Sequence, residues 1–100
     1  MNHHFRDRKL LDLAYQVTCQ VRLPGCQGGP GEPAHSNQSR HGKGGMLKAH
    51  DCFFASACRA CHRELDQGRT LNREEKFDLW QRAHEATFLE LWKRGLIGVK

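Results

Sequence analysis

Two cysteines with two residues between them, Cys58 and Cys61, are followed directly by a histidine, His62. A second pair, Cys19 and Cys26, lies earlier in the chain and encloses a Pro-Gly turn. Thiolates are the preferred ligands of a structural zinc ion, which binds four ligands in a tetrahedron. We therefore predict one zinc ion bound by all four cysteines, whose binding stabilises the fold. The alternative is a set of reduced, partly buried cysteines without a metal ion.

The remaining cysteine, Cys52, is expected to pack within the fold rather than to bind metal. A thioredoxin-like redox use of Cys58 and Cys61 requires a βαβ pattern that the flanking sequence lacks, and it leaves the first pair unexplained. No apolar stretch is long enough to span a membrane and no signal-peptide pattern is present, so we expect a cytoplasmic protein without a membrane partner. Disulfides are disfavoured in that compartment.

The length and composition of the chain predict a single domain with a nucleic-acid partner. Its 100 residues give one domain over 1–100, in which residues 1–7 are expected to be flexible. Hydrophobic residues make up only 38% of the chain, so a bound metal ion would add stability that a small core lacks. The formal net charge of +5 suits a polyanion, most simply nucleic acid.

Short elements are expected before the second cysteine pair. Stretches rich in glycine over 25–33 and 37–45 predict loops. Around these loops the apolar spacing predicts, in chain order, a helix over 8–16, a strand over 18–23, a short strand over 34–36 and an extended piece over 46–49. Asp51 is placed to cap a helix over 53–66, which Gly68 would end.

The last helix has the clearest pattern. Asn72 and Glu75 have capping-box spacing at its start, and Gly95 is its natural end. Its apolar stripe consists of Phe77, Trp80, His84, Phe88, Leu91 and Trp92. Because His84 lies inside this stripe, we expect a packed core histidine rather than a catalytic one. The face expected to contact the rest of the domain, or a second subunit in a homodimer, carries Leu79, Ala86 and Leu89. A terminal strand is predicted over 96–99.

The predicted helix with the second cysteine pair can present two different sides. One side carries Cys58, Cys61 and Leu65 and can face a metal ion. The neighbouring side carries the polar residues Arg59, His62, Arg63 and Asp66, which can face a groove. The two arginines either contact phosphates or form a solvated face, and the residues alone leave both alternatives open.

The residues of this region resemble a known motif. Ala34-His35, the basic glycine-rich loop and Cys58-x2-Cys61-His62 resemble the HNH (His-Me finger) endonuclease motif. Most of the chain from Thr18 onward is also similar to a small lambdoid phage and prophage family, the YbcO-type nucleases. The stretches that support this second resemblance are Cys19-Gln-Val-Arg-Leu-Pro-Gly-Cys26, Ala34-His35, Gly42-Lys43-Gly44, residues 48–51, residues 58–66 and Gly95-Leu-Ile97.

The resemblance implies a small α+β fold of the ββα-metal (HNH-like) type, held together by zinc, with flanking helices and a long C-terminal helix. The implied activity is metal-dependent hydrolysis of phosphodiester bonds in DNA, in phage or prophage recombination or processing. His35 would be the general base that activates a water molecule. His62 would bind a catalytic Mg²⁺ or another divalent cation. Lys43, with Arg40 and His41, would add positive charge near the substrate.

Two positions depart from the motif. Ala34 stands where many HNH sites have a second metal ligand, and Phe53 stands where the motif has its middle asparagine. The catalytic metal would then be bound by His62 with help from Asp51 or Asp66. The residues expected to contact nucleic acid are Arg40, Lys43, Lys48, Arg59 and Arg63. Both departures favour an alternative, a non-catalytic zinc-finger module that binds DNA or a phage or host recombination protein. A purely structural zinc protein is a third hypothesis.

Overall fold

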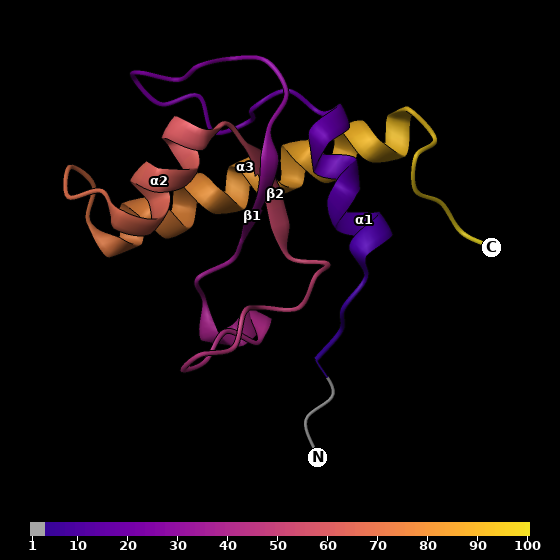
Figure 1. Cartoon of the computed structure of the whole chain (residues 1–100), viewed down its shortest axis with the longest axis horizontal. Helices are drawn as coiled ribbons and strands as arrows, with labels where there is room; N and C mark the ends of the chain where they lie inside the picture. Colours follow the sequence, from indigo (N-terminus) through magenta and orange to yellow (C-terminus); the bar gives the residue numbers. More distant parts are fainter. Residues whose placement is uncertain (1–3) are drawn as a thin grey trace.

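A two-stranded antiparallel sheet lies at the centre of the computed structural model, which describes residues 4–100 (Figure 1). The long helix α3 crosses behind this sheet, and α1 and α2 lie on either side of it. Within the described part of the chain, no helix is both long and apolar enough to cross a lipid bilayer. The elements are, in chain order, α1 (Arg8–Asp12), the 3-10 helix η1 (Leu13–Gln16), β1 (Glu32–His35), the 3-10 helix η2 (Ser39–His41), β2 (Phe54–Ala57), α2 (Arg59–Gln67) and α3 (Arg73–Lys93).

Strand β2 is the centre of the core. It pairs with β1 so that Glu32 lies opposite Ala57 and His35 lies opposite Phe54. All four residues of β2 are buried, and the three after Phe54 are small, which leaves room for α3 to pack against the strand. The strand predicted over 34–36 is therefore confirmed, although β1 begins two residues earlier.

Side chains of α3, and the backbone of the residue that follows η1, form hydrogen bonds with polar groups of the sheet. The backbone N–H of Ser56 donates to the Thr87 hydroxyl at 2.9 Å, and the Ser56 hydroxyl donates to the Val17 carbonyl at 2.7 Å. Trp80 Nε1 donates to the Ala34 carbonyl at 2.9 Å. Because a buried backbone group without a partner is costly, these bonds stabilise a sheet of only two strands.

The helix predicted over 53–66 is wrong in its first part. Its first residues form β2 instead, because their burial and their pairing with β1 outweigh the helical tendency of an alanine-rich stretch. Helix α2 begins only after Cys58, whose Sγ accepts a hydrogen bond from the Cys61 N–H at 3.4 Å and caps the helix. Gly68 follows the last residue of α2, as predicted.

Residues 4–7, part of the stretch predicted to be flexible, form hydrogen bonds with the rest of the domain. The carboxylate of Asp51 accepts a hydrogen bond from the Asp7 N–H at 2.7 Å. The N–H of Asp51 donates to the Phe5 carbonyl at 2.9 Å. Asp51 therefore anchors the N-terminal segment and does not cap a helix. The rest of the predicted flexible stretch, residues 1–3, lies outside the described residues.

Three predicted strands do not form within residues 4–100. Residues 18–23 include Arg22 in the left-handed conformation, with φ of 57°, which interrupts an extended strand. Met46 lies in an exposed turn closed by the bridge between Gly44 and Leu47, Ala49 is buried without strand pairing, and residues 96–99 follow α3 without pairing to a strand. The helix predicted over 8–16 is confirmed as the consecutive elements α1 and η1.

Helix α3 follows its sequence pattern most closely. Its capping box is present, with the Glu75 N–H donating to Asn72 Oδ1 at 2.8 Å. Leu79 packs against the core near the cysteines, whereas Leu89 on the same predicted face is exposed. Trp92, which the apolar stripe includes, is 51% exposed. The side of α3 that faces the core does not include it. The buried residues of α3 are Trp80, Ala83, Thr87 and Leu91.

Two histidines, His41 and His84, lie in the interior beside Trp80. His84 Nδ1 donates to the Phe54 carbonyl at 2.7 Å and its ring stacks on Trp80 with centroids 4.8 Å apart, which confirms a core histidine. Burial lowers the pKa of both imidazoles, and the charge of Arg40 lowers the pKa of His41 further. Both rings are therefore neutral in the folded protein near pH 7.

We expect His41 and His84 to lower the free energy of unfolding as the pH falls below about 6.5, the ordinary histidine pKa. In that range the unfolded chain binds protons that the folded chain does not, and this difference favours unfolding until the lowered folded-state pKa is reached. His84→Gln keeps a donor for the Phe54 carbonyl and should remove part of this pH dependence. Urea unfolding of the metal-loaded proteins from about pH 8 to about pH 5.5 measures it, and parallel curves would contradict the prediction.

Candidate functional site

The four cysteines predicted to bind metal come together in the structure. The Sγ atoms of Cys19, Cys26, Cys58 and Cys61 all lie within 4.8 Å of one another. Two belong to the long loop before β1 and two belong to the start of α2, so the cluster joins distant parts of the chain. Across residues 4–100, no other group of histidine, cysteine and acidic residues has this arrangement. These cysteines could hold one metal ion.

Backbone N–H groups point at the sulfur atoms. Cys58 Sγ accepts hydrogen bonds from the N–H groups of Gln27 and Cys61, both at 3.4 Å, and Cys26 Sγ accepts one from Gly28 at 3.4 Å. Burial opposes ionisation of Cys58, but its two N–H donors outweigh this effect and lower the pKa of the thiol to about 6. Burial raises the pKa of the Cys61 thiol. A cation among the sulfurs would offset the cost of ionising neighbouring thiols.

The two histidines proposed for catalysis line one groove. His35 is the last residue of β1, and His62 lies in the first turn of α2, which follows β2 directly. The groove between them has a volume of about 360 Å³, and Lys43, Lys48 and Asp66 contribute to its walls. The structure therefore brings together all three predicted catalytic residues, His35, His62 and Lys43.

Asp51 is the hydrogen-bond partner of His35 and does not itself line this groove. His35 Nε2 donates to Asp51 Oδ1 at 2.9 Å, and the carboxylate is only 4% exposed. Burial opposes ionisation of Asp51, but the hydrogen bonds from His35 and from the Asp7 N–H outweigh it and lower the pKa of the carboxyl. With its proton on Nε2, His35 has a free lone pair on Nδ1, an atom without a hydrogen-bond partner among the described residues. Of the two acidic residues predicted as alternative partners of His62 at the catalytic metal, Asp66 lies beside that ring and Asp51 does not line the groove.

His62 lies between two carboxylates. Its Nδ1 donates to Glu32 Oε2 at 2.7 Å, and its Nε2 lies 3.3 Å from Asp66 Oδ2. Asp66 and, to a lesser degree, Glu32 raise the pKa of the imidazole, against the opposing effect of burial. The two carboxylates contact opposite nitrogens of the ring. Their oxygens therefore do not converge on one position where a metal ion could bind.

Four of the five cationic residues predicted to contact nucleic acid lie near the histidines. Lys43 and Lys48 line the groove itself. Arg59 and Arg63 line an adjoining hollow that also contains His62, and Arg59 pairs with Glu32 at 3.4 Å. These cations surround a surface that an extended phosphate backbone could follow.

The fifth predicted cation, Arg40, and the nearby His41 point elsewhere. Arg40 Nε donates to Gln38 Oε1 at 2.7 Å, and Arg40 does not line the groove. His41 is buried, shares a hydrogen bond of 2.6 Å with the Ser36 hydroxyl and stacks on Phe53 with centroids 4.3 Å apart. His41 therefore belongs to the core and cannot supply charge to a bound polyanion.

The two positions that depart from the HNH motif are used for packing. Ala34 is buried and its carbonyl holds the Trp80 indole, while Phe53 covers His41. The carboxylate missing at Ala34 has a counterpart two residues earlier, in Glu32. Residues two apart in a strand share a face, so Glu32 lies on the same face of β1 as Ala34. The predicted strand begins at residue 34 and therefore does not include Glu32.

We expect the purified protein to contain one metal ion per chain, and serine substitutions at Cys19, Cys26, Cys58 or Cys61 to lower that content strongly. The matched control is Cys52→Ser, because Cys52 is a free cysteine outside the cluster. Metal analysis together with thermal unfolding measures both effects. Removal of the metal by a chelator should abolish the cooperative transition, since metal binding supplies folding free energy in small domains. Full metal content in a cluster variant, or equal loss in Cys52→Ser, would contradict this assignment.

Comparisons of the chain with family models, with curated proteins and with solved structures give no significant match. A function for this chain must therefore be argued from the geometry of its groove and its cysteine cluster.

Proposed function

We propose that the protein is a metal-dependent DNA endonuclease of the HNH type with a structural zinc ion, acting in phage or prophage DNA recombination or processing. The observation that supports this most directly is that His35 and His62 share a groove with Lys43. Phosphodiester hydrolysis needs a general base, stabilisation of negative charge and contacts that position the phosphate. Side chains suited to each requirement line this groove.

His35 is the general base in this proposal. Asp51 accepts the Nε2 proton of His35, so the neutral ring presents the Nδ1 lone pair for removal of a proton from water. The lowered pKa of Asp51 keeps this carboxylate ionised near neutral pH. Asp51 thus fixes the tautomer and the orientation of the imidazole without taking up the proton itself. Asp51 is a positioning residue in this reaction.

His62 and Asp66 are the residues that would hold the divalent cation on the opposite side of the groove. Their donor set fits Mg²⁺ through the carboxylate and Mn²⁺ or Ni²⁺ through the imidazole as well. The carboxylates of Glu32 and Asp66 raise the pKa of His62, so a cation must compete with a proton for this ring. When bound, such a cation stabilises negative charge on the phosphate and on the leaving oxygen.

Zinc is the ion that best suits the four-cysteine cluster. Four sulfur ligands in a tetrahedral arrangement favour zinc, and a site closed by four protein ligands is typical of a structural ion. Three of the four cysteines are buried, which leaves little access for a substrate. The cluster supports the position of α2, and the reaction takes place in the groove.

The alternative is a non-catalytic zinc-finger module that binds DNA or a phage or host recombination protein. Two observations favour it: Ala34 and Phe53 fill motif positions with apolar packing, and both nitrogens of His62 already contact carboxylates. The same cationic surface would then bind nucleic acid without cleaving it.

We expect the zinc-loaded protein to nick or linearise supercoiled plasmid when Mg²⁺, Mn²⁺ or Ni²⁺ is added. His35→Ala should lower the rate about a hundredfold or more, which is the usual contribution of a general base. Zinc content and circular dichroism of the variant establish that it is folded.

If no metal gives cleavage above the His35→Ala background, the endonuclease proposal fails. Gel-shift measurements on single-stranded and double-stranded DNA then test the binding module. Binding that weakens in Lys43→Gln and Lys48→Gln would support the module, since both cations line the groove.

Asp51→Asn should lower the cleavage rate by about tenfold or more while DNA affinity and zinc content stay unchanged. An uncharged amide can accept or donate a hydrogen bond, so it no longer selects the tautomer of His35 that leaves Nδ1 free. Single-turnover cleavage and fluorescence anisotropy separate the chemical step from binding. A variant that cleaves at the normal rate would show that Asp51 serves only to anchor residues 4–7.

A further inference from the structure

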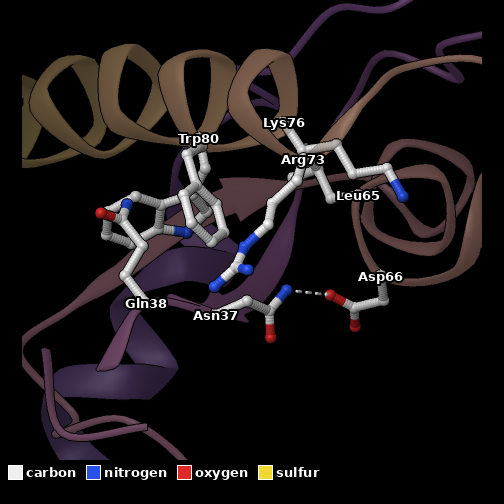
Figure 2. A pocket seen from close by; sticks show the side chains of 8 residues that line it. Asn37, Gln38, Leu65, Asp66, Arg73, Lys76 and Trp80 are labelled. Carbon is white, nitrogen blue, oxygen red and sulfur yellow. Dashed lines mark hydrogen bonds between the residues drawn. The ribbon is translucent and has the colours of Figure 1, made fainter. Parts of the chain in front are cut away.

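A second cavity adjoins the groove, and we infer that it binds an unpaired nucleotide of the DNA strand next to the phosphate that is cleaved. This inference rests on the proposed function and specifies its substrate as single-stranded or locally unpaired DNA. The cavity has a volume of about 300 Å³ and lies between α2, α3 and the segment after β1 (Figure 2). Its walls include Gln38, Asp66, Arg73, Lys76, Phe77 and Trp80.

The cavity and the catalytic groove share part of their walls. Asn37 and Asp66 line both, and Asn37 Nδ2 donates to Asp66 Oδ1 at 3.0 Å (Figure 2). A strand whose phosphate lies between His35 and His62 can therefore place its adjoining nucleotide in the cavity without leaving the surface of the protein.

Gln38 supplies a hydrogen-bond donor that no described residue uses. The side chain is 7% exposed, and its Nε2 is a buried nitrogen without a partner within residues 4–100. Its Oε1 accepts from Arg40 Nε at 2.7 Å, which fixes the orientation of the amide and leaves Nε2 as the free donor. Buried donors are normally satisfied, so this one indicates a ligand with an acceptor. A nucleobase offers such acceptors in its ring nitrogens and carbonyl oxygens.

The charge of the cavity suits a phosphate. The Arg73 guanidinium lies 5.2 Å from the centroid of the Phe77 ring, and no carboxylate pairs with it in the described chain. Lys76 donates to the Gly68 carbonyl and likewise keeps its charge without a carboxylate. The one acidic residue, Asp66, is already held by Asn37 and His62. Two cations and a satisfied carboxylate favour an anionic ligand over a metal ion.

Aromatic side chains give the cavity a surface for a base. Phe77 and Trp80 both line it; Trp80 is 4% exposed and its ring already stacks on His84, so Phe77 is the more accessible ring. Bases stack on aromatic rings with little dependence on sequence. A base paired in a duplex cannot enter a cavity of this kind, because it must first leave the stack. The cavity therefore predicts a preference for single-stranded DNA, for a flap or for the unpaired region of a junction.

Trp80 can report binding by its fluorescence once the other tryptophan, Trp92, is replaced by phenylalanine. We expect saturable quenching when deoxynucleoside 3′,5′-bisphosphates are added to zinc-loaded Trp92→Phe protein without other divalent ions. Phe77→Leu keeps the apolar volume and removes the ring, and Arg73→Gln removes a cation. Phe77→Leu should weaken binding about tenfold, as loss of one stacked base does. Arg73→Gln should weaken binding by about the same factor. Arg82→Gln, an exposed cation of α3 outside the cavity, is the matched control and should leave binding unchanged.

Three outcomes would overturn the inference. The first is the absence of saturable quenching, and the second is equal quenching by inorganic phosphate, which would leave an anion site without a base. The third is equal affinity of the His35→Ala protein for a fluorescent single strand and for its duplex. Because none of these measurements depends on cleavage, they are distinct from failure of the endonuclease assay. Bisphosphate binding that requires Phe77 and Arg73 in a protein that cleaves no DNA would retain the nucleotide site and reject only the nuclease.

Discussion

The convergence of four sulfur atoms fixes where α2 begins relative to the sheet. Cys58 has two functions there, since its Sγ belongs to the cluster and also accepts the N–H of Cys61 at the start of the helix. Strand β2 ends at the residue before it. The position of His62 relative to His35 therefore depends on one covalent connection and one cluster. In a chain with so few hydrophobic residues, a metal ion in this cluster would add stability that the small core lacks.

The two histidines of the groove differ in how many carboxylates they contact. Asp51 contacts only Nε2 of His35, whereas Glu32 and Asp66 contact both nitrogens of His62 and raise its pKa. In the proposed reaction, the ring with a single carboxylate partner is the base, and the ring between two carboxylates lies where the cation would bind. Asp51 is itself held by the Asp7 N–H.

The parts of the structure that depend on local spacing could be predicted from the sequence. The cysteine pairs and the capping box of α3 are of this kind, because each involves neighbours along the chain. Strand β2 could not be predicted, since its alanine-rich stretch is extended only through burial against α3 and pairing with β1. The contacts of Glu32 with His62 and of Asp51 with Asp7 join residues far apart in sequence, so no local pattern encodes them. The groove was predictable in its histidines and in Asp66, one turn of helix after His62, but not in Glu32 or in the contact of Asp51 with His35.

The anchoring of residues 4–7 has a practical consequence for any recombinant form of this protein. The two oxygens of Asp51 hold the Asp7 backbone and His35, so a purification tag or a fusion partner at the N-terminus would lie close to the residue that orients His35, the base of the proposed reaction. Val99, near the other end, is 91% exposed. A tag at the C-terminus leaves the imidazole undisturbed, and an inactive preparation with an N-terminal tag would say little about the native chain.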